Sequence, residues 1–263
     1  MELFDTHAHF DDFAEEGSVA DVLAEARAAD VARVVAIGGS PSANRLALRL
    51  AGEHAPMLRC ACGFDRDQAH ASPDESELRE CLQSKRCVAV GECGLDYHYQ
   101  PDSAEAQRSL FELNLSLALE FGLPVVVHSR DADEDTIAML KEYARACDPA
   151  RESIGVLHCY TRDRKMAREL LDIGFHISFS GIVTFKNAEM LRGVAAYLPS
   201  ERIVIETDSP YLAPEPMRGR RNQPALIAHI AKRLAELRST SVEDFAAVST
   251  RNARQLFGMD ADE

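Results

Sequence analysis

The stretch VVVHSR, residues 125–130, decides the fold of this chain. Its three consecutive valines predict a strand buried on both faces, because a strand with one exposed face would alternate apolar and polar residues. The run ends in a histidine, and four other apolar runs end in the same way, in side chains that can bind a metal. The set is His7, His9, Glu92, His128, His158 and Asp208. Metal-binding side chains at the same place in separate strands indicate one shared site.

Apolar runs of strand length alternate with amphipathic segments along the chain. We expect eight strands, at Glu2–Thr6, Ala32–Ile37, Met57–Gly63, Cys87–Glu92, Pro124–His128, Ile154–His158, His176–Phe179 and Arg202–Glu206. Helical segments lie between them, for example at Ser18–Ala29, Ser103–Glu120 and Asp163–Leu171. This alternation predicts an α/β fold, the TIM (β/α)8 barrel. Because that fold builds its active site at the carboxyl ends of the strands, we expect the six side chains to meet there.

The chain has the size of one barrel. Its 263 residues, 46% of them hydrophobic, predict a single TIM-barrel metallohydrolase domain over residues 1–258, followed by a short acidic tail at residues 259–263. Two helices are expected after the last strand. Asn222 is predicted to cap the first, with Pro224 in its opening turn, and the second covers Val242–Phe257.

Composition excludes several classes of protein. A net charge of -14 argues against a broad basic face that wraps duplex DNA, because such binding neutralises many phosphates. Seven cysteines without a secretion signal indicate a reduced, cytoplasmic protein. Four of them fall inside strand-like runs, where buried small hydrophobic residues are expected: Cys60, Cys62, Cys87 and Cys93. No apolar run is long enough to cross a membrane, and we expect a monomer.

The ligand count predicts two divalent cations. His7 and His9 are two residues apart, so both project from the same side of their strand. Four imidazoles and two carboxylates exceed the needs of one catalytic metal that keeps an open position. We therefore expect Glu92 to bridge two cations. One is held by His7, His9 and Asp208, and the other by His128 and His158. Imidazoles favour Zn or Mn over Mg, and the identity stays open among these three.

Two further carboxylate roles follow from this arrangement. Asp208 is the candidate to accept a proton from a water that the cations activate, with Glu92 as a second candidate catalytic carboxylate. Glu206 lies on the same side of its strand as Asp208. We expect Glu206 to orient a histidine ligand or to assist the proton transfer. His98 follows the Glu92 strand and either contacts substrate or is solvated.

The stretch SPYLAPEPMRGRRNQP, residues 209–224, carries the phosphate signal. Arginines cluster there just before a predicted helix start, and the last loops of TIM barrels often bind phosphate. The predicted phosphate-binding residues are Arg130, Arg218, Arg220, Arg221 and Asn222. The alternative is that the arginines of this loop are only solvated charges.

The chain resembles the TatD family of metal-dependent deoxyribonucleases, within the amidohydrolase-like barrels. The motifs that carry the resemblance are DTHAHFDDF, GECGLDYHYQ, VVVHSRDA, LHCYT, ETDSPYLAP and RGRRNQP, in this order along the chain. The resemblance implies a TIM barrel with two divalent metals on the same six residues, and Mg-supported activity. It also implies 3'-5' exonuclease-type hydrolysis of DNA phosphodiesters. DNA ends or short single strands are the expected substrate, with RNA as a second one. Arg162 in HCYTRD stands where the family usually has Gly, and MRGRRNQP has Arg where Lys is common.

Two other functions stay open. A two-metal site can also hydrolyse a small-molecule amide, lactone or phosphoester, because a fold does not determine its function. A neutral substrate would not need the arginines of the loop at residues 209–224, here called the arginine loop. Dependence of activity on this loop therefore distinguishes a nuclease from this alternative. The second is a non-catalytic barrel that binds nucleic acid or a protein partner, and absence of bound metal would favour it.

Overall fold

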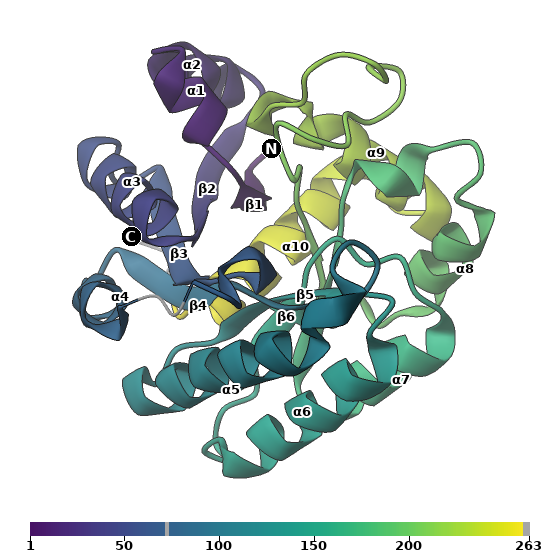
Figure 1. The fold of residues 1–263 in the computed structure, drawn as a ribbon. Coiled ribbons are helices and arrows are strands. Elements are labelled where there is room, and N and C mark those ends of the chain that lie inside the picture. Colours follow the sequence, from purple (N-terminus) through teal and green to yellow (C-terminus); the bar gives the residue numbers. More distant parts are fainter. Residues whose placement is uncertain (72–73, 260–263) are drawn as a thin grey trace.

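The protein is an eight-stranded barrel surrounded by helices (Figure 1). The computed structural model describes residues 1–71 and 74–259. The strands are β1 Leu3–Ala8, β2 Val31–Gly39, β3 Leu58–Phe64, β4 Cys87–Asp96, β5 Val125–Arg130, β6 Gly155–Leu157, β7 Phe175–Phe179 and β8 Ile203–Ile205. Every neighbouring pair from β1 to β8 is parallel, in chain order. The predicted TIM barrel is confirmed.

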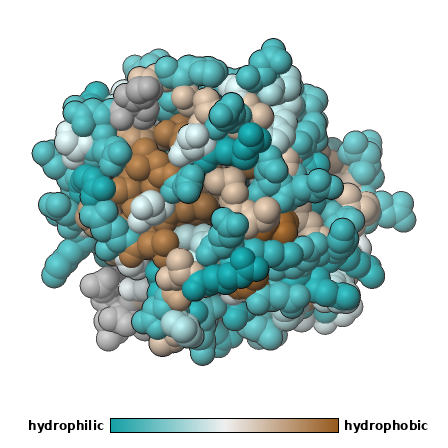
Figure 2. Space-filling view, turned by 60° about the horizontal axis from the view of Figure 1, so that its bottom comes forward, coloured by the Kyte–Doolittle hydropathy of each residue, from teal (hydrophilic) through white to brown (hydrophobic). Residues whose placement is uncertain are grey.

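Helices follow the strands and cover the outside of the barrel. They are α1 Asp11–Glu15, α2 Val19–Ala28, α3 Pro41–Glu53, α4 Glu75–Leu82, α5 Ala104–Phe121, α6 Asp133–Ala146, α7 Arg164–Asp172, α8 Glu189–Tyr197, α9 Ile227–Arg238 and α10 Val242–Leu256. In Figure 2, hydrophilic residues surround an apolar area on the face shown. Within residues 1–71 and 74–259, no helix combines the length and the apolarity that a membrane span requires.

The barrel closes between β1 and β8 at the end where the site forms. The hydroxyl of Thr6 donates to the carbonyl of Ile205 at 3.0 Å, and Ala8 bridges to Ser209. The backbone N–H of Asp208 donates to the carbonyl of His7 at 2.9 Å. These contacts bring the first and the last predicted ligand segments side by side.

Small, branched and aromatic side chains fill the barrel interior. The last helix closes the end of the barrel that lies opposite the predicted ligands. The interior cluster contains Phe4, Val35, Ile37, Ala61, Val88, Ala89, Val126, Val156 and Val204. From α10 and the residues after it, Phe257 packs its ring 5.9 Å from the ring of Phe4, and Met259 is buried beside it. The predicted tail therefore starts after this buried methionine, and its residues 260–263 lie outside the described part of the chain.

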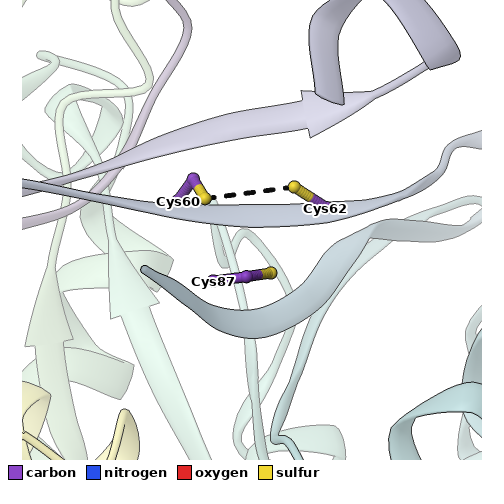
Figure 3. A group of neighbouring side chains, drawn as sticks. All are labelled: Cys60, Cys62 and Cys87. Carbon is purple, nitrogen blue, oxygen red and sulfur yellow. Dashed lines mark hydrogen bonds between the residues drawn. The ribbon is translucent and has the colours of Figure 1, made fainter. Parts of the chain in front are cut away.

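The cysteines pack as the sequence predicts. Cys60 and Cys62 on β3 and Cys87 on β4 are buried in the layer between strands and helices, and Cys93 is buried too. Figure 3 shows the first three side by side, with 4.0 Å between the sulfurs of Cys60 and Cys62. Although three sulfurs this close could hold a soft metal, they are surrounded by apolar core residues.

Most strand boundaries differ from the prediction by one or two residues, and two larger differences, in β4 and before α9, bear on the site. β4 continues to Asp96, so Glu92 lies inside a strand and not at its end. A register shift between Val90 and Cys93 bends β4, and pairing with β5 then resumes. Gly94 permits this close approach, because a Cβ at this position would lie 2.0 Å from the carbonyl oxygen of His128.

The predicted helix at Asn222 starts later than expected. A short 3-10 turn, Pro224–Leu226, precedes α9, and Gln223 occupies the position before the turn. The side chain of Asn222 is instead fully buried, and its amide donates to the carbonyls of Thr207 and Tyr211 at 2.8 and 2.5 Å. Asn222 therefore fixes the long loop after β8.

Candidate metal centre

Four predicted ligands meet around one oxygen of Glu92. Oε2 of Glu92 lies 3.4 Å from Nε2 of His7 and 3.6 Å from Nε2 of His9. Oδ1 of Asp208 lies 3.7 and 3.6 Å from the same two nitrogens. The two histidine nitrogens are 3.2 Å apart. One carboxylate, two imidazoles and one Glu92 oxygen thus surround a single point.

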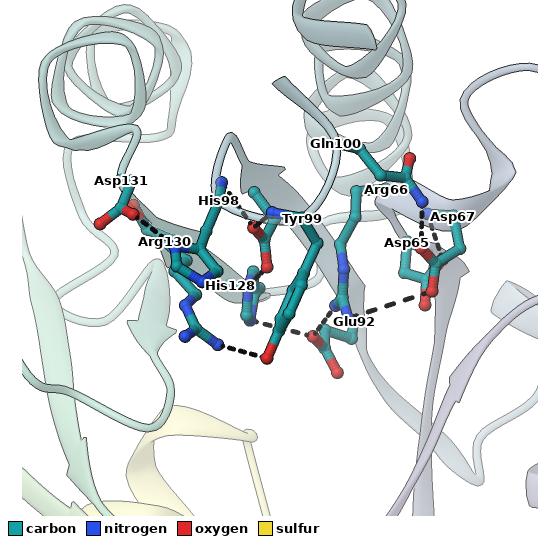
Figure 4. A network of polar contacts seen from close by, with 12 residues as sticks. Asp65, Arg66, Asp67, Glu92, His98, Tyr99, Gln100, His128, Arg130 and Asp131 are labelled. Atoms are coloured by element: carbon teal, nitrogen blue, oxygen red, sulfur yellow. Dashed lines mark hydrogen bonds and ion pairs between the residues drawn. The ribbon is translucent and has the colours of Figure 1, made fainter. Parts of the chain in front are cut away.

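The other oxygen of Glu92 faces a second pair of histidines. Oε1 lies 3.4 Å from Nδ1 of His128 and 3.4 Å from Nε2 of His158, and these nitrogens are 3.3 Å apart. Arg66 donates to the same oxygen from Nη1 at 3.0 Å (Figure 4). The structure therefore brings all six predicted residues together, with Glu92 between two groups.

The donor atoms fit a divalent cation. Four ligands at zinc–nitrogen and zinc–oxygen distances around a tetrahedral ion stand about 3.3 Å from one another. The two histidine nitrogens lie 3.2 to 3.7 Å from each other and from the oxygens of Glu92 and Asp208. The set of imidazoles and carboxylates is also one that Zn or Mn prefers. Among the described residues of the site, two subsets could hold an ion, and His7 belongs to both: one joins it to Glu92 and His158, the other to His9 and Asp208.

Electrostatics keep the carboxylates ionised. Burial raises the pKa of Glu92, but His158 and His7 outweigh it and hold this pKa well below its usual range. Burial likewise opposes ionisation of Asp208, and the hydrogen bond with His9 and the charges of His7 and His158 lower its pKa. Both carboxylates are therefore ionised, and they in turn raise the pKa values of His158 and His9 against the effect of burial, which shows that the site favours positive charge.

Glu206 supports the site from behind. It is fully buried, and its Oε1 accepts from the backbone N–H of Cys159 at 2.6 Å and lies 3.4 Å from Nδ1 of His158. Its Oε2 accepts from the hydroxyl of Ser178 at 2.6 Å. The structure thus places Glu206 beside the ring of a predicted ligand, on the side away from the cavity. This geometry is that of a residue that positions His158, and a catalytic role for Glu206 stays a prediction.

Asp96 is a site residue that the sequence reasoning missed. Its Oδ2 lies 3.1 Å from Nε2 of His128, while its Oδ1 accepts from the backbone N–H groups of His98 and Tyr99 at 3.0 Å each. A carboxylate in this position leaves Nδ1 of His128 free to bind a cation. The sequence contained a signal for Asp96, because every second residue of a strand lies on the same side. Asp96 therefore shares the side of Glu92 and Gly94.

The loops that carry two ligands have left-handed backbone at non-glycine residues. Asp208 has φ 56° and Cys159, next to His158, has φ 46°. Such conformations are unfavourable and persist where the surroundings hold them. Asp5 provides one such contact, because it accepts from the backbone N–H and the hydroxyl of Thr207 at 2.9 and 2.6 Å.

The cluster lies in a cavity of about 1030 Å³ at the carboxyl ends of the strands. Glu92, His128, His158 and Asp208 line it. Two tyrosines on its wall are solvent-exposed, Tyr99 at 66% and Tyr211 at 59%. Its cationic lining consists of Arg66, Arg130 and Arg162.

Figure 4 shows how the wall around Tyr99 is held. Nη1 of Arg130 donates to the hydroxyl of Tyr99 at 3.0 Å, and the guanidinium lies 4.5 Å from the ring centroid. Nδ1 of His98 lies 2.9 Å from Oδ2 of Asp131. Arg162 reaches the same aspartate, with 3.4 Å between its Nη2 and Oδ1. The loops after β4, β5 and β6 are therefore joined at the rim.

The predicted phosphate-binding residues separate into two groups. Arg130 lines the cavity, whereas the exposed Arg218, Arg220 and Arg221 are not part of its lining. The guanidinium of Arg218 lies 3.8 Å from the ring centroid of Phe185. Arg221 pairs with Asp12 and Glu16 and lies over the ring of Phe13. The loop therefore brings Tyr211 to the cavity, whereas its three arginines and the buried Asn222 do not line it.

Comparison with known proteins gives the family. The family model described as TatD related DNase matches residues 4–258. The chain belongs to the TatD family. An uncharacterized metal-dependent hydrolase of Escherichia coli, YcfH, is 42% identical over 264 residues, which cover 99% of this chain and 97% of the relative. The membership makes this chain a metal-dependent hydrolase.

Two further TatD relatives bear on the fold and the substrate. The crystal structure of YjjV, a TatD homologue from Escherichia coli, has a TM-score of 0.90 and 28% identity, and the match covers 98% of both chains. A protein of Erwinia amylovora named 3'-5' ssDNA/RNA exonuclease TatD is 35% identical over 247 residues, covering 90% of this chain and 93% of that protein. One relative is thus named for nucleic-acid hydrolysis.

Proposed function

We propose that this TatD-family chain hydrolyses phosphodiester bonds at the ends of single-stranded DNA or RNA, as a 3'-5' exonuclease, with two divalent cations in the cluster. The observation that carries the proposal is the division of Glu92, whose two oxygens face separate groups of donors at the floor of one cavity. Two adjacent cations are common in enzymes that cleave phosphodiesters. The name of the Erwinia relative supports a nucleic-acid substrate.

The residues of the cluster have three proposed roles: they bind the cations, accept a proton and position the ligands. His7, His9 and Asp208 would hold one cation, His128 and His158 the other, and Glu92 would bridge them. When bound, such cations stabilise negative charge on phosphate oxygens and lower the pKa of water. Asp208 is held ionised at the edge of the cavity, so it can accept a proton as water attacks phosphorus. Asp96 and Glu206 keep the rings of His128 and His158 in place.

The rim of the cavity supports a single-stranded substrate. Tyr99 and Tyr211 expose their rings to solvent. Any of the bases of a single strand can stack on such rings, so this contact does not require a particular nucleotide sequence. Arg130 lies beside Tyr99 and presents a cation to a phosphate. The net charge of -14 disfavours long contacts with a duplex. A strand end that reaches the cations through this rim needs few phosphate contacts elsewhere.

The test is turnover of end-labelled single-stranded DNA and RNA of the same sequence, with Mg, Mn or Zn, before and after a chelator. We expect stepwise shortening that the chelator stops and the cation restores. His128→Ala should abolish it while the protein stays folded, and His229→Ala, which changes a histidine on α9, should not. Full activity of a folded His128→Ala protein, or hydrolysis of lactones and amides in place of nucleic acid, would contradict the proposal.

A further inference from the structure

Arg66 occupies a position in the metal centre that no strand-end pattern predicts. It begins a 3-10 turn, Arg66–Gln68, directly after β3. Its side chain is 21% exposed and extends to Glu92, with 3.0 Å between Nη1 and Oε1 (Figure 4). Asp65, which caps the turn, and Asp67 lie on the side of Arg66 away from Glu92 in this view. The guanidinium is thus held inside the cluster.

The contact makes the two halves of the cluster electrostatically unequal. Oε2 of Glu92 faces a half that contains the second carboxylate, Asp208. Oε1 faces a half with two imidazoles, from His128 and His158, and one guanidinium. Among the groups nearest Glu92, the first half therefore has a carboxylate and the second a guanidinium, while the carboxylates of Asp96 and Glu206 lie behind the imidazoles of the second half. A divalent cation is attracted to the first and repelled by the guanidinium in the second.

We propose that Arg66 competes with a divalent cation for Oε1 of Glu92 and so makes the His128–His158 half the weaker of the two cation sites. The inference rests on the ligand assignment of the proposed function. Arginine stays charged at any pH at which the protein is folded, so the competition cannot be relieved by deprotonation. It ends only when the guanidinium moves off the carboxylate, and the second cation enters at that point.

The test is titration of the metal-stripped full chain with Mn(II), followed by electron paramagnetic resonance, which measures free and paired Mn(II) separately from any turnover. For the wild type we expect two binding steps whose dissociation constants differ by about tenfold or more. Arg66→Met should tighten the second step by about tenfold and leave the first within about twofold. Arg66→Lys keeps the charge, so its second step should stay weak.

Arg130→Met is the matched control, because it removes a positive charge from the same cavity without touching Glu92. An unchanged second step in Arg66→Met would overturn the inference, and so would equal tightening in Arg130→Met. Arg66→Gln is the second charge-removing variant and decides the outcome if Arg66→Met does not fold. One tight and one weak step in every variant would contradict only the role of Arg66. A wild-type chain that binds no Mn(II) would contradict the proposed function itself.

Discussion

The contact between Asp96 and His128 gives a quantitative prediction for Asp96→Asn. Burial raises the pKa of Asp96, but the hydrogen bond with His128 and the N–H of Tyr99 lower it further, to about 2. A depression from 3.8 to about 2 corresponds to roughly 2 kcal/mol of preference for the charged carboxylate. The N–H of Tyr99 and the charge of Arg66 share this preference, so the contact with His128 accounts for part of it. Asp96→Asn removes a carboxylate that orients a predicted ligand and should therefore weaken cation binding about tenfold or more.

Cation binding should weaken in Asp96→Asn because the substitution changes which nitrogen of His128 carries the proton. In Asp96→Asn, the amide oxygen can still accept from His98 and Tyr99, so the loop keeps its hydrogen bonds. The amide nitrogen then faces Nε2 of His128 and donates to it. This leaves the proton on Nδ1, which is the nitrogen that faces Glu92.

The assay is competition between the protein and a chelating dye for Zn or Mn, with thermal unfolding as the check on the fold. Asp131→Asn is the matched control, because Asp131 makes a similar contact with His98 at the rim, outside the proposed ligands. The reasoning is refuted if Asp96→Asn keeps its cation affinity within about twofold, or if Asp131→Asn loses as much.

Two further predictions concern the lower barrel and the rim. His176 is fully buried in β7, and burial, followed by the charge of Arg202, lowers its pKa from 6.5 to about 4. Below pH 6.5, His176 binds a proton in the unfolded chain but stays neutral in the folded chain. The free energy of unfolding therefore decreases as the pH falls from 6.5 towards 4. Urea denaturation measures the free energy of unfolding at pH 7 and pH 5. Its decrease between the two should be about 2 kcal/mol smaller in His176→Leu than in the wild type, and equal decreases would contradict this. Tyr99→Ala and Tyr211→Ala should each raise the KM for single-stranded DNA about tenfold with little change in kcat, because a stacked base contributes about 1–3 kcal/mol. Steady-state kinetics check this, and a fall in kcat at constant KM would show that the rings do not bind substrate.

The barrel could be predicted from the sequence because its signal is local. Each strand is a short apolar run, and the runs alternate with amphipathic segments whose period is set by the helix. The convergence of His7, His128 and Asp208 followed from topology alone, since parallel strands in a barrel end on the same face.

The rest depends on contacts between segments far apart in the chain. Pairing with β5 resumes after the register shift and continues to Asp96, so Glu92 lies within β4 and Asp96 lies at its end. Arg66 follows β3 in a turn without periodicity, so only the folded loop shows its contact with Glu92. Phosphate binding by the loop at residues 209–224 stays a prediction, and the pairing of Arg221 with Asp12 and Glu16 is visible only in the folded chain.

The central claim is that Glu92 divides one cluster into two cation sites. The direct measurement is anomalous X-ray scattering from crystals soaked in Mn(II). The account predicts a strong peak enclosed by His7, His9, Asp208 and Oε2 of Glu92, with a weaker peak at Oε1 beside His128. A single peak at Glu92 at saturating Mn(II), or bound Mn(II) without any peak there, would show that Glu92 does not divide the cluster into two sites.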